Sequence, residues 1–122
     1  MGKFLSHAAV GVPPEIMGIG PAYAIPKALK IANLCKHSIS VYQINEAFAS
    51  QCTYSRDFLQ IDPRKVNPKG GAIAIGHPLG CTGAREFATL LEVLIREKKK
   101  LGVISMCIGT GMGAAAVIEA EW

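Results

Sequence analysis

Short, β-rich apolar segments alternate with segments of helical spacing along the whole chain, and no other feature restricts the fold so strongly. The strand-like segments are LSHAAVGV (5–12), HSISVYQI (37–44), AIAI (72–75), VISMCI (103–108) and AAAVIEA (114–120). Strands alternating with helices predict right-handed crossovers and parallel pairing, whereas the glycine turn before the last strand predicts an antiparallel return. The order β-α-β-α-β-α-β-β therefore predicts an α/β fold, a mixed and mostly parallel five-stranded sheet with helices on its faces.

Three segments between these strands have helical spacing. The first follows a Gly- and Pro-rich loop and runs to about Leu34; Pro21 and Pro26 fit only near its start, because proline lacks the N–H that a helix interior needs. The second begins at or beside Asn45. The third, 82–100, is the clearest, with an apolar stripe of Phe87, Leu90, Leu91, Leu94 and Ile95 and with polar positions Glu86, Glu92, Arg96 and Glu97.

Length and composition favour one domain over residues 1–122. Half of the 122 residues are apolar, which is enough for a single core and too many for a disordered chain. Much of the net charge of +4 lies at 96–100, where a helix ends and where cations complement its dipole. The four cysteines form no CxxC pair and there is no secretory segment. We therefore expect a reduced, intracellular protein that binds no nucleic acid.

The stretch 101–118 carries no charged residue and follows a basic segment, as a membrane tail anchor would. Its glycines, together with Ser105 and Thr110, make a poor spanning helix and favour two buried strands joined by a glycine turn. The first residues, MGKFLS, fit a myristoylation pattern, but so short a pattern often occurs by chance. We therefore expect no membrane association and no targeting signal in this chain.

Three polar or reactive side chains lie at the ends of predicted strands. Asn45 follows the second strand, His77 follows the third, and Cys107 ends the fourth beside the glycines of CIGTGMG. Because loops at the carboxyl ends of parallel strands share one edge of the sheet, we expect Asn45 and His77 to be neighbours. Each alone has a structural alternative, respectively a helix cap, a hydrogen-bonded filler and a small core residue. Their joint placement favours a site.

These residues lie in segments that resemble a known family. NEAFA (45–49), GGAIAIGHPLGCTGAR (70–85) and CIGTGMG (107–113) resemble the three C-terminal signature blocks of thiolases, which cleave or form 3-ketoacyl-coenzyme A thioesters. The segments GVPPEIMGIGPAYAIPKAL (11–29) and MGAAAVIE (112–119) are most similar to the peroxisomal 3-ketoacyl-coenzyme A thiolases. The resemblance implies the C-terminal half of the thiolase fold and a part in acyl transfer during fatty acid β-oxidation.

The resemblance also implies roles for the three side chains. His77 would assist deprotonation of a nucleophilic thiol and would polarise the thioester carbonyl through its N–H. Asn45 would hold the water that is the second donor to the same oxyanion. Cys107 would be the general acid and base for the α-carbon or for the leaving coenzyme A thiol.

Further positions follow from the same resemblance. The backbone N–H of Gly109 would contribute to a second oxyanion hole, and Met17 and Phe48 would line the acyl and pantetheine end of the pocket. Coenzyme A would be a substrate, with no metal and no other cofactor. A peroxisomal location is implied, although the ending EAEW is not a peroxisomal tripeptide and would otherwise leave the chain in the cytoplasm.

The nucleophilic cysteine of the family belongs to its first half, which these residues do not resemble. Covalent catalysis needs both a nucleophile and its base, so we expect the chain to be inactive unless an N-terminal thiolase half completes it and its acyl-coenzyme A site. The alternative is a non-catalytic module that binds a thiolase subunit or itself; in either case we expect exposed apolar surface and a homo-oligomer. At position 43 this sequence has glutamine, whereas the family commonly has an acidic residue there.

Overall fold

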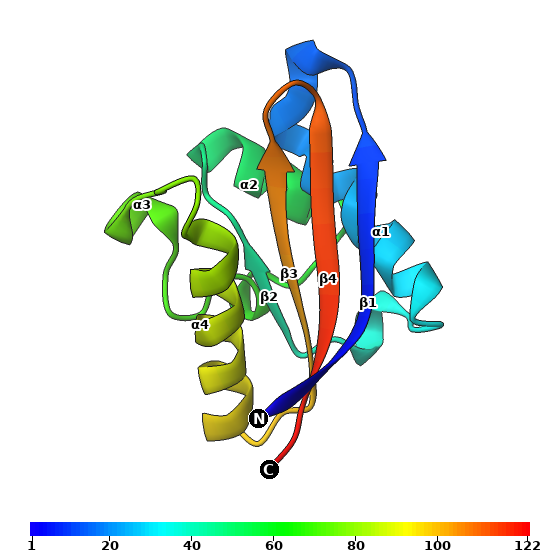
Figure 1. The fold of residues 1–122 in the computed structure, drawn as a ribbon, viewed down its shortest axis with the longest axis vertical. Coiled ribbons are helices and arrows are strands. Elements are labelled where there is room, and N and C mark those ends of the chain that lie inside the picture. The colour runs from blue at the N-terminus through cyan, green and yellow to red at the C-terminus, as the bar shows by residue number, and fades with distance from the viewer.

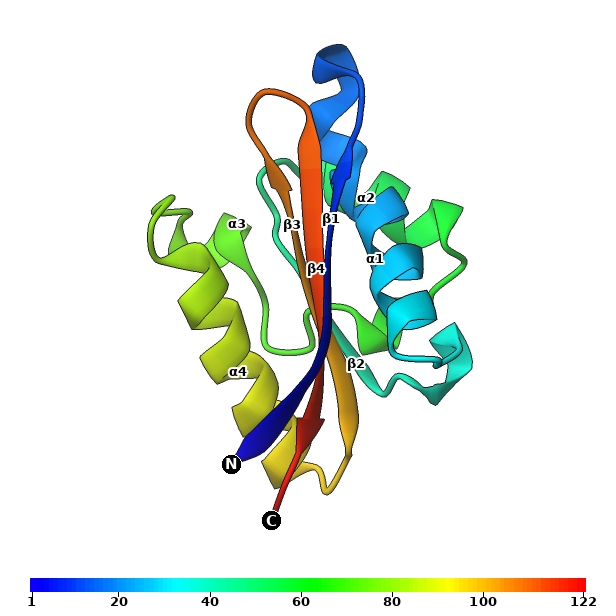
Figure 2. The ribbon, with the colours of Figure 1, turned by 45° about the vertical axis from the view of Figure 1, so that its right-hand side comes forward.

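A four-stranded sheet lies between two layers of helices in the computed structural model, which describes all 122 residues (Figure 1). The strand order is β1-β4-β3-β2. The strands are β1 (Gly2–Gly11), β2 (Val41–Ile44), β3 (Leu101–Ile108) and β4 (Met112–Ala120). The helices are α1 (Gly20–Ile31), α2 (Ala49–Phe58), α3 (Ala72–Ile75) and α4 (Thr82–Arg96), with 3-10 turns at Pro14–Ile19, Lys36–Ser38 and Pro63–Lys65. Helices α1 and α2 cover one face of the sheet and α4 lies on the other (Figure 2).

The α/β class is confirmed, but the sheet has four strands rather than five and is mostly antiparallel. Only β2 and β3 pair in parallel, whereas β4 pairs antiparallel with both β1 and β3. The predicted strand 72–75 is wrong, because AIAI forms the single-turn helix α3. A four-residue apolar run does not distinguish a strand from a helical turn. The place beside β2 is taken instead by Val66, which forms an isolated bridge with Tyr42.

Each face of the sheet has its own apolar core, because residues alternate between the faces along every strand. On the α1 side, Ile25 and Leu29 of α1 pack in one cluster with Tyr42 and Ile44 of β2. On the α4 side, a second cluster consists of Val41, Leu90, Val93, Leu94, Ala116, Ile118 and Ala120. The alternation places Gln43, between Tyr42 and Ile44, on the α4 side.

Several predicted helix details are corrected. Pro26 lies inside α1 rather than near its start, and α2 begins at Ala49 rather than beside Asn45, with the Phe48 N–H bonded to the Gln51 side chain. Helix α4 ends at Arg96. Its buried stripe includes Glu86, expected outside but 3% exposed, and Val93, which the predicted stripe omitted. Ile95, expected inside, is 40% exposed. The 100° turn per residue places position 86 directly one turn before Leu90, the centre of the buried stripe.

The stretch 101–118 forms two strands joined by a turn, as predicted. Residues 101–108 pair with 112–119 in an antiparallel hairpin whose turn includes Gly111, with a φ of 100°. No helix of the structure combines the length and apolar character that crossing a bilayer requires.

Glycines allow α1 and β4 to meet at the backbone. A Cβ on Gly20, at the start of α1, would lie 2.6 Å from the Cα of Gly113. Any side chain at either position would therefore separate the helix from the sheet. The contact fixes the segment that precedes α1 against the end of the sheet where β3 finishes.

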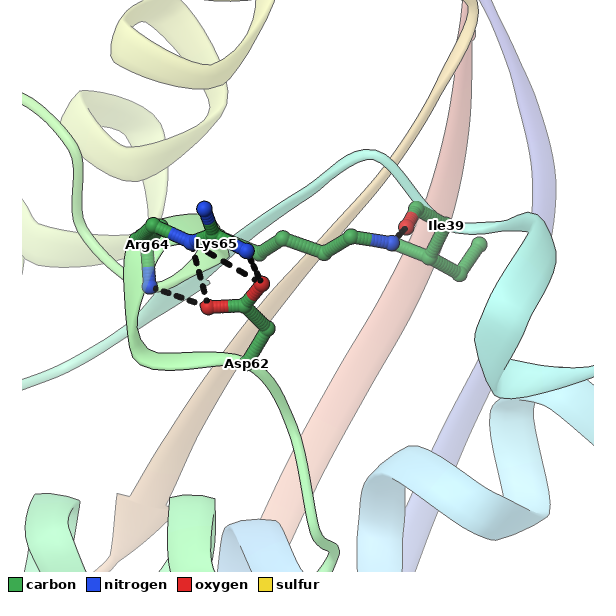
Figure 3. A network of polar contacts seen from close by, with 4 residues as sticks. All are labelled: Ile39, Asp62, Arg64 and Lys65. Atoms are coloured by element: carbon green, nitrogen blue, oxygen red, sulfur yellow. Dashed lines mark hydrogen bonds and ion pairs between the residues drawn. The ribbon is translucent and has the colours of Figure 1, made fainter.

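A polar network joins the turn Pro63–Lys65 to the segment that leads into β2 (Figure 3). Asp62 accepts the Arg64 backbone N–H at 2.9 Å and the Arg64 guanidinium at 2.7 Å. The Arg64 guanidinium holds the pKa of Asp62 at about 2. Lys65 extends away from this pair and donates to the Ile39 carbonyl at 2.8 Å. The turn thus keeps the following segment along the outer edge of β2.

Candidate active site

A cavity of about 450 Å³ lies at the carboxyl ends of β2 and β3. Five of the six predicted site residues line it, namely Met17, Phe48, His77, Cys107 and Gly109. They come from the 3-10 turn before α1, the β2–α2 connection, the α3–α4 connection and the end of β3. A larger cavity of about 560 Å³, near the end of α1, contains none of the predicted residues. The sheet edge is therefore where the candidate groups meet.

The sixth residue, Asn45, lies directly against His77. Its amide nitrogen is 3.2 Å from His77 Nε2 and 3.4 Å from Nδ1. Asn45 itself is 1% exposed and follows β2, where its backbone N–H donates to the Ser105 carbonyl of β3 at 2.8 Å. The expected neighbourhood of Asn45 and His77 is found, although His77 follows a helical turn and not a strand.

A threonine that the sequence analysis did not single out fixes the imidazole. The Thr82 hydroxyl lies 2.6 Å from His77 Nδ1 and donates to the Pro78 carbonyl at 3.1 Å. Because its one proton goes to Pro78, the threonine oxygen accepts the proton on Nδ1. The Asn45 amide nitrogen, which can only donate, lies 3.2 Å from Nε2 and requires an acceptor there. We assign the Nδ1–H tautomer on both grounds, which leaves Nε2 unprotonated and facing the Asn45 amide.

The backbone that carries His77 is held on both sides. Gly76 has a φ of 87°, a conformation that favours glycine, and its carbonyl accepts the Arg85 guanidinium at 2.6 Å. After His77, Pro78 restricts the histidine to extended conformations. The histidine thus emerges from a turn whose direction is set before and after it.

A glutamate anchors the start of the same segment. Glu46 accepts the Ile73 backbone N–H at 3.1 Å and the Asn67 amide at 3.0 Å. Gly71 packs so closely on this carboxylate that a Cβ there would lie 2.6 Å from it. Glu46 directly follows Asn45 in the chain, so one short segment supplies both an amide beside His77 and the anchor of the loop that carries His77.

The Asn67 side chain occupies the place that a neighbouring strand would take beside β2. Its side chain accepts the Ile44 N–H at 2.9 Å and donates to the Ile44 carbonyl at 2.8 Å, as a neighbouring strand's backbone would. Its φ of 47° turns the chain away from the sheet edge at this point. The pairing ends β2 one residue before Asn45 and fixes the direction in which Asn45 leaves the sheet.

Cys107 occupies an environment that keeps its thiol protonated. It is 8% exposed, and burial raises its pKa, with a smaller contribution from the nearby Glu86 carboxyl. A buried thiol holds its proton more tightly than an exposed one, because the thiolate is poorly solvated there. Cys107 is therefore suited to carry a proton rather than to attack as a thiolate.

The other cysteines lie outside this cavity. Burial raises the pKa of Cys52 to about 11, and its thiol lies against the Ile44 carbonyl at 3.9 Å. Cys35 and Cys81 are exposed. No cluster of three or more His, Cys, Asp or Glu side chains has the geometry to hold a metal ion.

Two of the residues that hold the His77 segment, Thr82 and Arg85, could have been identified from their spacing in the sequence. Thr82 follows Pro78 by four residues at a helix start, the spacing that brings a hydroxyl to a preceding carbonyl. Arg85 lies one turn further along the same helix. Glu46 and Asn67 could not, because their partners are backbone groups of distant segments.

Comparison with known proteins identifies the family. The model of the thiolase C-terminal domain matches residues 1–120. The chain belongs to the thiolase family. The peroxisomal 3-ketoacyl-CoA thiolase of Homo sapiens is 62% identical over 120 residues, which are 98% of this chain and 28% of the human protein. The resemblance to the peroxisomal branch of the thiolases is thereby confirmed. This thiolase domain spans little more than a quarter of the curated relatives' length.

Two solved structures of the peroxisomal thiolase of Saccharomyces cerevisiae superpose on this thiolase domain with a TM-score of 0.92 and 58% identity. They are matched over 99% of this chain and over 35% and 30% of theirs. One is described as five α-β-α-β-α layers built from two core domains of identical topology, and the other as dimeric.

Proposed function

We propose that residues 1–122 act as a single thiolase C-terminal domain that supplies the acid and base groups for acyl transfer between a 3-ketoacyl-coenzyme A and coenzyme A. The observation that carries this proposal is the shared cavity of His77 and Cys107, with Nδ1 of the histidine bound to Thr82. An imidazole with an available Nε2 and a protonated thiol are the two proton carriers that carbon–carbon thiolysis requires. The domain's similarity to the peroxisomal thiolases supports the substrate class and a peroxisomal location.

His77 would act at the thiol side of the reaction. Nε2 accepts the proton of the nucleophilic thiol, and the thiolate attacks the 3-keto carbonyl to give a tetrahedral oxyanion. The N–H now present on Nε2 donates to that oxyanion, together with a water held by Asn45. The placement of the Asn45 amide against the ring supports this shared role.

Cys107 would act at the α-carbon. When the oxyanion collapses, the bond between the α- and β-carbons breaks, and the enolate of acetyl-coenzyme A takes the thiol proton of Cys107. The Cys107 thiolate then takes the proton of the coenzyme A thiol, whose sulfur attacks the carbonyl of the acyl-enzyme. The bond between the acyl group and the enzyme's sulfur breaks, the shortened acyl-coenzyme A leaves, and the departing thiolate takes back the proton from His77. Gly109 would stabilise the enolate oxygen through its N–H, while Met17 and Phe48 contact the acyl and pantetheine portions.

The nucleophile would come from outside these 122 residues. Of the cysteines here, Cys107 is assigned to proton transfer, Cys52 is buried in the core, and Cys35 and Cys81 lie outside the cavity. Covalent catalysis without a nucleophile gives no turnover. We therefore expect no thiolase activity from this chain alone.

The layer arrangement supports a second half as the partner. This domain forms one α-β-α set of layers, and the yeast relative has five layers made from two domains of identical topology. Two such sets make five layers only if they share one helical layer. We propose that a second thiolase half covers the α4 side of the sheet, and that the completed enzyme forms dimers as that yeast relative does.

Thiolysis of acetoacetyl-coenzyme A tests the function. The purified chain alone should give no turnover, whereas mixing it with an N-terminal thiolase half from a peroxisomal relative should give activity. Changing either His77→Ala or Cys107→Ala should reduce that activity by about a hundred-fold or more. Lys30→Gln, at an exposed position of α1 on the other side of the sheet, is the control and should have no effect.

Turnover by the isolated chain that disappears in His77→Ala would contradict the need for an external nucleophile. Unchanged activity of both active-site variants in the reconstituted enzyme would contradict the roles. Stable association without any activity would favour the alternative function, a non-catalytic module that binds a thiolase subunit or itself. This alternative is supported by the apolar part of the sheet around Phe4 and Met106, which no helix covers and which could bind another chain.

A further inference from the structure

Among the buried polar side chains that have one atom without a hydrogen-bond partner, two lie between the sheet and α4. Gln43 on β2 and Glu86 on α4 are both 3% exposed. The unpartnered atoms are Gln43 Nε2, a donor, and Glu86 Oε2, an acceptor. A buried polar atom without a partner is costly, so native proteins rarely retain one without a reason.

The level of α4 relative to β3 is fixed by two contacts. A Cβ on Gly102 would collide with the Leu90 side chain, and a Cβ on Gly83 would lie 3.1 Å from Met106 Cε. Helix α4 therefore runs antiparallel to β3, with its start near Met106 and its middle over Gly102.

Glu86 lies between Gly83 and Leu90 on α4, and therefore at the level of Ile104 on β3. In the parallel pairing of β2 with β3, the partner of Ile104 is Gln43. Gln43 also shares its sheet face with Val41, which packs against α4. The unpartnered donor and the unpartnered acceptor thus lie at one level of the helix–sheet interface, and no hydrogen bond joins them in this structure.

The next level towards the cavity contains the candidate active site. Thr82 precedes Glu86 by one helical turn on the same face of α4, and Asn45 follows Gln43 by two residues on the same face of the β2 line. Both contact the His77 ring. The level of Gln43 and Glu86 is therefore directly next to the level of Asn45 and Thr82.

We propose that a change of side-chain rotamer pairs Gln43 with Glu86, and that the pair forms a buried polar layer that positions Asn45 and Thr82 around His77. An amide and a protonated carboxyl match as partners: the acid donates its O–H to the amide oxygen, and the amide donates its N–H to the acid's other oxygen. Burial raises the pKa of Glu86 to about 8, so this carboxyl keeps its proton at neutral pH. Both are positioning residues, since neither lines the cavity.

The surroundings of Glu86 contain few charges. Arg85, its neighbour on α4, lowers the Glu86 pKa slightly, and the thiols of Cys107 on β3 and Cys52 on α2 are near enough to interact with it. The positions of β2 and β4 that pack against α4 are uncharged: Val41, Gln43, Ala116, Ile118 and Ala120. Ionisation of Glu86 is therefore opposed mainly by loss of water.

A double-mutant cycle tests the pair. Gln43→Leu and Glu86→Leu should each lower the Tm of the chain by about 5 °C or more, because each leaves its partner buried and unpaired. The double variant should lose much less than the sum of the two, since both polar groups are then gone. Additive losses would overturn the pairing.

The pH dependence of stability gives a measurement that does not need the leucine variants to fold. The Glu86 carboxyl ionises at about 4.5 when unfolded and at about 8 when folded. The folded state therefore binds the extra proton in this range, and the free energy of unfolding should fall as pH rises from about 4.5 to about 8. Glu86→Gln should remove this fall, while Glu92→Gln on the exposed face should retain it. An identical fall in Glu86→Gln would overturn the buried, protonated pair.

The positioning role has its own readout in the histidine ring. In nitrogen NMR spectra, Glu86→Leu should change the His77 ring shifts and reduce the Nδ1–H form, whereas Glu86→Gln, which can still pair with Gln43, should restore the wild-type pattern. Unchanged ring shifts in Glu86→Leu would overturn the positioning role. Its importance for thiolysis rests on the proposed function, but no measurement here requires turnover, so an inactive reconstituted enzyme would contradict that function and leave this inference intact.

Discussion

His77 receives its orientation from a hydroxyl rather than from a carboxylate. The Thr82 oxygen is 2.6 Å from Nδ1 and gives its own proton to Pro78. A neutral acceptor fixes the tautomer without adding negative charge beside the ring. The arrangement directs Nε2 to the cavity side of the ring, where a base that takes and returns a proton would need it.

Removing that hydroxyl should release the tautomer. Thr82→Val keeps the shape of the side chain but leaves Nδ1–H without an acceptor, so the ring should populate both tautomers and the domain should lose about 1 kcal/mol of stability. Two-bond nitrogen–proton NMR correlations of His77 measure the tautomer directly, and thiolysis by the reconstituted enzyme should fall about ten-fold or more. Thr82→Ser retains the hydroxyl and is the control. A pure Nδ1–H form in Thr82→Val would show that another group holds the ring.

The loop from 66 to 77 is attached to β2 by side chains where a regular sheet would use another strand. Asn67 makes both bonds to Ile44, and Glu46 holds the backbone of Ile73. Because these anchors are few and local, the position of His77 depends strongly on each of them. The loop is therefore fixed to the sheet edge by specific side-chain hydrogen bonds.

Asn67→Ala should therefore weaken the whole loop. The variant loses two hydrogen bonds to β2 and places alanine at a φ of 47°, so we expect a loss of about 2–3 kcal/mol in urea unfolding. Hydrogen exchange should accelerate at Ile44 and across 70–77. Gln60→Ala is the matched control, since Gln60 is exposed and has a similar φ of 52°. Equal losses in the two variants would assign the effect to backbone conformation alone.

The sequence predicted the elements that have a strong period and missed those that depend on distant partners. The hairpin of β3 and β4 and the body of α4 followed from their patterns, and the shared edge of Asn45 and Cys107 followed from strand order. His77 lies at that edge as expected, but the strand from which its position was predicted does not form. The segment 72–75 was misassigned, because the place beside β2 was already taken by Val66 and by the Asn67 side chain. No local pattern records that competition.

The burial of Glu86 was missed for a related reason. A glutamate in a helical pattern is normally placed in water, and only the level of α4 against β2 brings it opposite Gln43. The roles of the site residues came from the family resemblance, whereas the tautomer of His77 needed the position of Thr82.

The two faces of the sheet are covered unequally. Helix α4 packs mainly over β3 and β2, so β1 keeps an apolar side chain exposed at Phe4, which is 59% exposed. A hollow of about 180 Å³ beside it is lined by Phe4, His7, Ile104, Ser105, Met106, Ala114, Ala115 and Ala116. An apolar surface of this kind on a sheet face favours association.

We therefore expect the isolated chain to form a dimer or larger species in size-exclusion chromatography. Phe4→Lys should shift it towards monomer by placing a charge on this face. Ile31→Lys is the control, because Ile31 is 57% exposed but lies at the end of α1, on the other side of the sheet. A wild-type chain that remains monomeric from dilute to concentrated solution would contradict the exposed-face argument.

The contact between Gly20 and Gly113 sets a dimension of the cavity. Gly113 is the sheet partner of Cys107, and Gly20 follows the turn that carries Met17. Since the two backbones touch, the turn that carries Met17 is held close to the strand pair that contains Cys107 and Gly113. In the function proposed above, we expect the length of acyl chain that fits between them to be set by the side chains that line the cavity, Met17, Phe48 and Leu79 among them, rather than by a shift of the backbone.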